Sequence, residues 1–191
     1  MGRSGCGKGT QAKLLIEHIK SGDPEAQVLY VETGNKFRDF IAGTSYSSRL
    51  AKEVALRGDL QPQFLAVHMW SDVLFENLMG DEHVVFAGTP RHREEAEVLD
   101  SALKFYGRNK VNVVFVDISP EETKKRMEAR GRADDRHPGD IDKRLAWYEK
   151  DVVPAIKFFE EHPDYNLIHL NGEQPIEAVQ RDLIKVLYGE S

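Results

Sequence analysis

A glycine-rich stretch close to the start of the chain constrains the fold more than any other feature. Residues 2–10 read GRSGCGKGT and match the pattern G-x-x-x-x-G-K. Apolar residues at helical spacing follow directly, from Gln11 to Ile19, and this motif requires a helix in that place. Glycines allow the backbone to curl until successive N–H groups point at a phosphate, and the helix N-terminus adds the positive end of its dipole. The stretch therefore predicts a phosphate-binding loop.

Within this loop, Lys8 is expected to reach the β- and γ-phosphates of a nucleotide as a point charge. The alternative is an ordinary glycine-rich turn with an incidental lysine. Three motif glycines, Lys8 and Thr10 occur together, which disfavours that alternative. Cys6 is interpreted as a small space-filling residue, because no candidate base lies near it in the sequence.

The composition fits one domain and excludes several classes of protein. A chain of 191 residues that is 40% hydrophobic can bury a substantial core. Its formal charge of −6 argues against a nucleic acid or an anionic membrane as the partner. Cys6 is the only cysteine, so neither an intrachain disulfide nor a cysteine-rich zinc site can form. With no apolar stretch of about 18 residues and no signal-peptide pattern, we expect a soluble cytoplasmic protein.

Short apolar runs alternate with longer stretches of helical periodicity. The runs predict strands at 28–32, 83–87, 111–118 and 166–170. Helical spacing predicts helices at 11–19, 64–79, 94–106, 141–161 and 176–187. Most of the predicted strands lack polar alternation, as expected for strands that are buried on both faces. The pattern therefore predicts an α/β fold with three layers, α/β/α, around a parallel sheet of about five strands. Segments 33–61 and 131–140 are expected to be mobile inserts.

The segment GKGTQ, residues 7–11, resembles the adenylate kinase family of nucleoside monophosphate kinases. Further segments recur in the family's order along essentially the whole chain after its first residue. They are Thr33-Gly34 with Arg38, Gly58-x-Leu60-x-Pro62, Gly88-x-Pro90-Arg91, Arg130-Gly131-Arg132-x-Asp134-Asp135, Lys143-Arg144-Leu145 and Asn171-Gly172. The resemblance implies one phosphate-loop kinase domain over 1–191, with a helical monophosphate-binding insert at 33–61 and a short lid at 131–140. It also implies that a monomer transfers the γ-phosphoryl group of ATP to a nucleoside monophosphate, with Mg²⁺ carried by ATP and no direct protein ligand to the metal.

The resemblance assigns the site residues to three groups. For ATP it implies Gly5, Cys6, Gly7, Lys8, Gly9, Thr10, Arg126 and Gln174. For the nucleoside monophosphate it implies Thr33, Gly34, Arg38, Gln61, Gly88, Arg91 and Glu95. Around the transferring phosphoryl group it places Lys8, Arg91, Arg130, Arg132 and Arg144.

Arginine is a suitable residue for this chemistry, because its planar fork can donate two hydrogen bonds to one oxyanion. Phosphoryl transfer draws most of its rate from positioning and charge stabilisation, so a local cluster of arginines on an acidic protein is expected. The alternative for Arg126, Arg130 and Arg144 is that they are solvated charges on a helix surface.

Three departures from the family pattern affect these expectations. The family has a central strand before the loop, but here only Met1 precedes Gly2, so we expect the chain to be a truncated fragment without that strand. Ala87 stands where the family has an aspartate that acts on magnesium through water. Apart from these three departures, the lid is short, and too short for the family's zinc-type lid.

The third departure is Glu95, which stands where the family has a glutamine against the adenine edge of AMP. An ionised carboxylate only accepts hydrogen bonds, whereas guanine offers two donors, its N1–H and its amine. AMP is the first expectation for the acceptor, and Glu95 keeps GMP open. The alternative is that Glu95 is merely a solvated helix residue.

Two other functions stay open. A kinase for another small molecule would need a carboxylate base for a hydroxyl acceptor, and the Thr33-Gly34 segment with Arg38 argues against it. A nucleotide-binding module without turnover is suggested by the absent strand and by Ala87. Arginines in a lid have little use in binding alone, which argues against the module.

Overall fold

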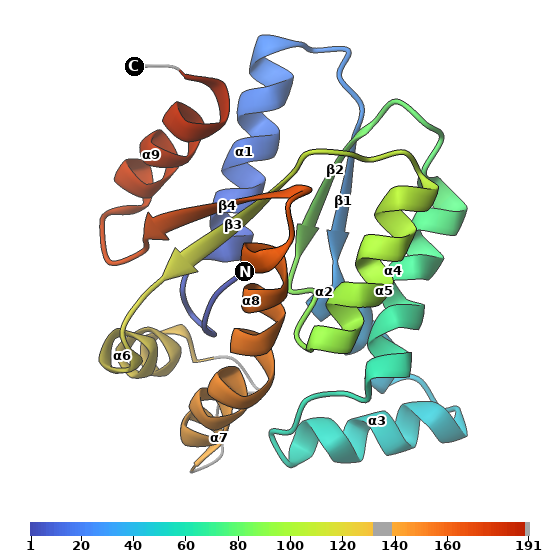
Figure 1. Ribbon diagram of the computed structural model, residues 1–191. Coiled ribbons are helices and arrows are strands. Elements are labelled where there is room, and N and C mark those ends of the chain that lie inside the picture. Colours follow the sequence, from blue (N-terminus) through green and yellow to red (C-terminus); the bar gives the residue numbers. More distant parts are fainter. Residues whose placement is uncertain (132–138, 190–191) are drawn as a thin grey trace.

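Among the residues that the structure describes, two pairs of parallel strands form the centre of the protein. The computed structural model describes residues 1–131 and 139–189, and Figure 1 labels its elements. The strands are β1 (Val28–Glu32), β2 (His83–Ala87), β3 (Val111–Asp117) and β4 (Tyr165–Asn171). The sequence predicted β1 and β2 to the residue, while β3 ends one residue earlier than predicted and β4 is longer at both ends. Strands and helices alternate along the chain, which confirms the α/β prediction.

The strands form two separate pairs, whereas the sequence predicted one sheet of about five. β1 pairs in parallel with β2, with Val28 opposite His83. β3 pairs in parallel with β4, with Val111 opposite Tyr165. Within the described residues no strand joins β2 to β3, so the described strands do not form one continuous sheet.

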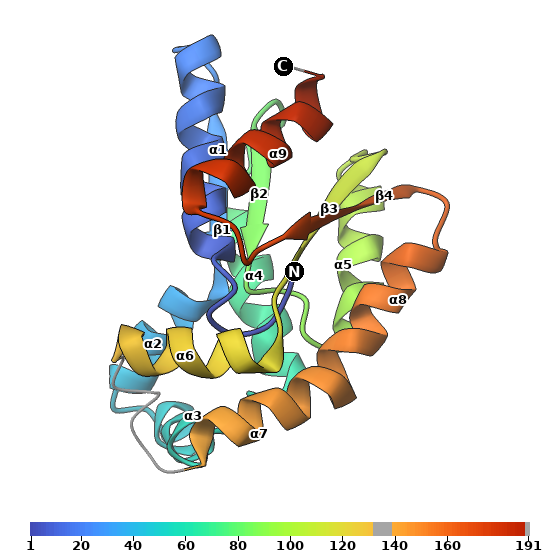
Figure 2. The same ribbon diagram turned by 90° about the vertical axis from the view of Figure 1, so that its left-hand side faces the viewer.

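Met1 lies in the place between the two pairs. Its amine donates a hydrogen bond to the backbone oxygen of Val114, and its carbonyl accepts one from the N–H of Val116 at 3.0 Å. Figure 1 and Figure 2 both show the N-terminus between β2 and β3. Met1 thus supplies two backbone hydrogen bonds on the β3 side of this place.

Helices cover both faces of the strands. On one side α1 (Lys8–Gly22) packs against α9 (Ile176–Tyr188). On the other side lie α4 (Gln63–Asn77), α5 (Arg93–Phe105) and α8 (Val153–Glu161), as Figure 2 shows. Beyond the carboxyl ends of the strands lie α2 (Thr33–Ala42), α3 (Tyr46–Leu56), α6 (Pro120–Arg130) and α7 (Asp140–Trp147). In the part of the chain that is described, no helix has both the length and the apolar character to cross a membrane.

One apolar core joins the two strand pairs. Val31 of β1 and Val113 of β3 belong to the same buried cluster. Trp70, Leu99 and Phe159 complete its centre from the helices on one face. Side-chain packing therefore holds the pairs together where backbone hydrogen bonds between strands do not.

The helix predicted at 141–161 is divided into three parts. α7 ends at Trp147, a π-helical turn η2 (Tyr148–Val152) follows, and α8 begins at Val153. Pro154 has no N–H to donate to the preceding turn and its ring crowds that turn, which accounts for the interruption. The turn buries the side chains of Tyr148 and Val152.

Candidate active site

A cavity of about 660 Å³ lies where the phosphate loop, the insert at 33–61 and α7 meet. Its volume falls within the range of about 300–1,000 Å³ that is usual for small-molecule sites. The predicted site residues that line it are Gly5, Gly7, Lys8, Gly9, Thr10, Thr33, Gly34, Arg38, Gln61, Gly88, Arg91, Glu95, Arg130 and Arg144. The fold thus brings residues from distant segments of the chain to one place.

The phosphate loop has the backbone that its glycines predict. Gly7 has a φ of 98° and is the N-cap of α1, and its backbone oxygen accepts the N–H of Gln11 at 3.0 Å. Gly2 is required for a different reason, because a Cβ there would lie 2.3 Å from the backbone oxygen of Val116. The loop can therefore pass close to the end of β3 and aim the N-terminus of α1 at the cavity.

Lys8 folds back over its own loop. Its Nζ donates to the backbone oxygens of Gly2 at 3.1 Å and Arg3 at 3.0 Å. Partial removal from water lowers the pKa of Lys8, and repulsion from Arg91 and Arg130 acts in the same direction, against an opposing effect of Cys6. Lys8, Arg91 and Arg130 therefore repel one another at the cavity, and an anion with several charges would stabilise all three.

Arg38 and Arg91 enter the cavity from two different segments. Arg38, on α2, lies against Asn35 and is 3.9 Å from Glu32. Arg91 follows β2, and its Nε donates to the backbone oxygen of Gly88 at 2.8 Å. These contacts help to orient the two planar guanidinium groups at the cavity.

Helix ends position the two arginines on the other wall. Arg130 is the last residue of α6, and Gly131 ends that helix with a φ of 59°. Arg144 lies in the last turn of α7. A cation at a helix C-terminus is favoured by the helix dipole, which explains why the chain can place positive charge there.

Glu95 is buried, not solvated. Its side chain is 1% exposed, and it accepts hydrogen bonds from the hydroxyl of Thr89 and from the N–H of Arg91 at 2.7 Å. Burial by itself raises the pKa of Glu95, but hydrogen bonds from His92 and Thr89 outweigh burial and hold that pKa below its usual value. The interpretation of Glu95 as a surface residue was wrong, and its carboxylate is part of the turn that carries Arg91.

Three residues predicted for ATP do not line the cavity. The side chain of Cys6 is 2% exposed and belongs to an apolar cluster, in keeping with a space-filling role. Arg126 donates to Glu122 at 2.6 Å and to the backbone oxygen of Gly172 at 2.8 Å. Gln174 donates to Asp182 at 2.9 Å, and the turn that it shares with Gly172 lies beside α6.

The structure also places residues at the cavity that sequence reasoning did not identify. Trp147 lines it, and the Arg91 guanidinium lies 5.7 Å from the centre of its ring. Trp147 follows Arg144 by three residues, so helical spacing could have placed both on one face of α7. Lys143 of α7 donates to the backbone oxygen of Arg57 at 2.5 Å, which links α7 to the end of α3.

Part of the predicted site lies outside the described residues. Arg132 and positions 132–138 of the predicted lid belong to that part. Among the residues that are described, no group of three or more histidine, cysteine, aspartate or glutamate side chains could hold a metal ion. Ala87 ends β2 beside the cavity and contributes no side-chain oxygen.

Comparisons with known proteins agree on one family. The family model described as Adenylate kinase matches residues 1–163. Adenylate kinase 1 of Synechocystis sp. is 31% identical over 191 residues, which cover 98% of this chain and 94% of that protein. An adenylate kinase of Bacteroides fragilis is 30% identical, with 97% and 95% covered. An adenylate kinase of Nitrobacter hamburgensis is 32% identical, with 98% and 89% covered.

Proposed function

Since this chain belongs to the adenylate kinase family and is a phosphotransferase of the nucleoside monophosphate kinase type, we propose that it transfers the γ-phosphoryl group of ATP to AMP. The observation that carries this proposal is the convergence of Lys8, Arg91, Arg130 and Arg144 on one cavity. In this reaction a phosphate oxygen of AMP attacks the γ-phosphorus and the bond to ADP breaks, giving two molecules of ADP. The attacking oxygen is already an anion, so no side chain needs to act as a base.

In the proposed mechanism the residues of the chain position two anions and neutralise the charge between them. Backbone N–H groups of the loop and the N-terminus of α1 hold the ATP phosphates. Lys8 contacts the β- and γ-phosphates, and Arg130 and Arg144 approach the transferring group from α6 and α7. We assign Arg132 to the same cluster from the family pattern.

The acceptor occupies the side of the cavity that the insert forms. Arg38 and Arg91 clamp the phosphate of the monophosphate, and Thr33, Gly34, Gln61 and Gly88 line its binding site. The insert at 33–61 and the lid at 131–140 are the parts that close over the two nucleotides. Closure would exclude water, which strengthens every charge interaction inside the site.

Magnesium arrives as part of the substrate MgATP. The phosphates of ATP are the main ligands that this ion requires, and hard oxygen donors with retained water suit it. The described residues offer no cluster that would hold the ion without nucleotide. With Ala87 at the end of β2, the outer shell of the ion depends on water and the nucleotide.

The choice of AMP over GMP depends on Glu95. Both oxygens of its carboxylate accept hydrogen bonds within the turn, from Thr89 and from the N–H of Arg91. This engagement supports a role in shaping the turn, and it leaves less capacity for the donors of guanine. The names of the similar adenylate kinases also support AMP.

Turnover assays test the proposal directly. ATP consumption with magnesium is measured with AMP, GMP, CMP, UMP and no acceptor. AMP is expected to give the highest kcat/KM. If the wild-type protein instead prefers GMP and Glu95→Ala loses that preference, the protein recognises guanine through Glu95. Turnover with a small hydroxyl compound would favour another kind of kinase, and nucleotide binding without turnover would favour a binding module. The protein is expected to be a monomer by light scattering.

The place between β2 and β3 is proposed to take one further parallel strand, which would complete a single sheet in a three-layer fold. The hydrogen bonds of Met1 to Val114 and Val116 support this, because they begin such a ladder on the β3 side. The test adds a strand-forming segment of about seven apolar β-branched residues ahead of Met1. A higher melting temperature is expected, and a matched polar, flexible extension serves as control. Equal melting temperatures for the two extensions would contradict the proposal.

A further inference from the structure

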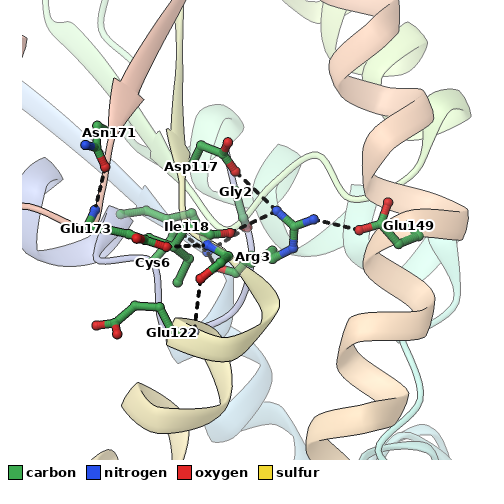
Figure 3. A network of polar contacts seen from close by, with 11 residues as sticks. Gly2, Arg3, Cys6, Asp117, Ile118, Glu122, Glu149, Asn171 and Glu173 are labelled. Carbon is green, nitrogen blue, oxygen red and sulfur yellow. Dashed lines mark hydrogen bonds and ion pairs between the residues drawn. The ribbon is translucent and has the colours of Figure 1, made fainter.

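Arg3 belongs to the phosphate loop, but its side chain contacts other elements. One terminal nitrogen of its guanidinium donates to Asp117 Oδ1 at 3.2 Å and to the backbone oxygen of Ile118 at 3.0 Å. The other terminal nitrogen donates to Glu149 Oε1 at 2.7 Å. Figure 3 shows this fork between the end of β3 and the helix that carries Glu149. The guanidinium also lies 4.3 Å from the centre of the Tyr148 ring.

The elements that Arg3 connects meet at the cavity from different directions. Tyr148 and Glu149 open the π-helical turn η2, directly after α7. α7 carries Arg144 and Trp147, which line the cavity. We call α7 together with η2 the α7–η2 arm. Arg3 therefore contacts this arm at η2, while α7 of the same arm carries Arg144, which is proposed to approach the transferring phosphoryl group.

The backbone of Arg3 acts on the opposite wall of the same site. Its carbonyl oxygen accepts a hydrogen bond from Nζ of Lys8 at 3.0 Å. A shift of Arg3 would thus move a group that orients Lys8. The side chain of Arg3 is not among the described residues that line the cavity, so its effect on the site would act through Lys8 and the elements that it contacts.

The contacts of Arg3 are suited to setting geometry more than to stabilising the fold. Its side chain is 15% exposed, while Asp117 and Glu149 are 57% and 60% exposed. Ion pairs with such exposed carboxylates contribute little to stability, because water screens them. A planar guanidinium that reaches two elements and stacks on a ring nevertheless fixes their relative orientation, which a flexible ammonium could not do.

From these contacts we infer that Arg3 is a positioning residue, which sets the phosphate loop with Lys8 and the α7–η2 arm with Arg144 in register for phosphoryl transfer. The inference rests on the proposed kinase function. It adds to that function a residue whose side chain does not line the cavity.

The test compares kcat, KM and melting temperature in Arg3→Ala, Arg3→Lys and Glu149→Ala. Loss of the fork is expected to lower kcat of Arg3→Ala by about 10- to 100-fold, as small misplacements of reacting groups do. KM for ATP and for the acceptor should stay within about twofold, because no binding contact is removed. Arg3→Lys keeps the charge but loses the fork, so its kcat should lie closer to that of Arg3→Ala than to wild type.

Glu149→Ala keeps the inference testable if changes at Arg3 impair folding, since Glu149 is largely exposed. Its kcat should also fall. The double variant Arg3→Ala, Glu149→Ala should have a kcat no lower than that of Arg3→Ala alone, because both substitutions remove the same ion pair between Arg3 and Glu149. Arg93→Ala is the matched control. Arg93 also pairs with a glutamate, Glu97 at 3.2 Å, and lies 5.8 Å from the ring of Phe158, but it does not line the cavity in the described residues.

The outcomes separate this inference from the proposed function. Wild-type turnover together with an unchanged kcat in Arg3→Ala and Glu149→Ala would overturn the positioning role alone. A lower melting temperature with unchanged kcat would assign Arg3 a purely structural role and overturn it as well. A wild-type chain that binds both nucleotides without turnover would overturn both proposals.

Discussion

Lys8 carries its charge into a site that already holds positive charge. Partial removal from water and the neighbouring guanidinium groups of Arg91 and Arg130 all lower its pKa. The positive electrostatic potential that disfavours the ammonium group of Lys8 also favours a polyphosphate anion, because the anion is attracted to all of these cations. This is how an acidic protein can still bind two anionic nucleotides.

Replacement of Lys8 by methionine keeps the length of the side chain and removes its charge. We expect kcat to fall by about 100- to 1,000-fold, the usual cost of losing one donor to transition-state charge. Steady-state kinetics with MgATP and AMP measure this loss. Lys20→Met, at the exposed end of α1, is the matched control and should keep wild-type kcat. Equal kcat values for the two variants would remove Lys8 from the mechanism.

Glu95 gives the protein an acid-sensitive contact. Its folded-state pKa lies below the ordinary value of 4.5, so the unfolded chain binds a proton here more readily than the folded protein does. The stabilising contribution of Glu95 is therefore complete above about pH 4.5, and it is lost as the pH falls through the folded-state pKa. Glu95→Gln removes this titration and should flatten the pH dependence of the free energy of unfolding in that acid range.

Denaturant unfolding of Glu95→Gln from pH 3 to pH 7 measures the effect. Glu94→Gln is the control, because Glu94 is the exposed neighbour on the same helix and accepts a hydrogen bond from Gln63 at 3.0 Å. The idea fails if the acid-range slopes of Glu95→Gln and wild type coincide.

At the scale of elements, two serine caps hold helices that border the cavity. The hydroxyl of Ser119 accepts the N–H of Glu122 at the start of α6, and the hydroxyl of Ser45 accepts that of Ser48 at the start of α3. Ser119→Ala and Ser45→Ala should each lower the free energy of unfolding by about 1 kcal/mol. Ser119→Asp keeps an accepting oxygen and should retain most of the stability. A full loss in Ser119→Asp would show that the cap hydrogen bond is not the cause.

The sequence predicted elements well where a short apolar run marks a strand. β1 and β2 are short apolar runs, and their bounds match the structure. α6 was not predicted, because only Thr123 and Met127 among its residues are buried and the rest of its surface is charged. The division of the helix at 141–161 followed from Pro154, a local signal that the apolar periodicity of the whole segment concealed.

The candidate site was predictable where a motif carried it. Lys8 and Arg91 belong to segments whose order along the chain indicated a common function, and both line the cavity. Arg3 and Trp147 were missed, since their importance lies in contacts with Glu149 and Arg91 that only the folded chain brings together. Sequence spacing also did not show that Arg126 lies against Gly172, outside the cavity lining.

At the scale of the whole molecule, one apolar core should make both strand pairs unfold together. Phe159 is 2% exposed in the cluster that includes Val31 and Val113. Phe159→Ala should lower the free energy of unfolding by about 3–5 kcal/mol, because it leaves a cavity shared by both pairs. Far-UV circular dichroism and tryptophan fluorescence, to which buried Trp70 contributes together with Trp147, should report the same midpoint.

Leu65→Ala provides the comparison, because Leu65 packs with Ala51 and Met69 in a separate cluster formed by the insert and α4. Its effect on the midpoint measured by tryptophan fluorescence should be smaller than that of Phe159→Ala. Two separate midpoints in Phe159→Ala would mean that the strand pairs belong to different cooperative units.

The edge of β3 that faces Met1 should set the rate at which its amide protons exchange with deuterium. Successive N–H groups of a strand point to opposite edges. Those of Val113 and Phe115 point toward β4, whereas those of Val114 and Val116 point toward Met1, and among them Val116 donates to the Met1 carbonyl. Protection should therefore alternate along β3, with the amide of Val114 exchanging faster than its two neighbours. Uniform protection would mean that this edge is covered in solution.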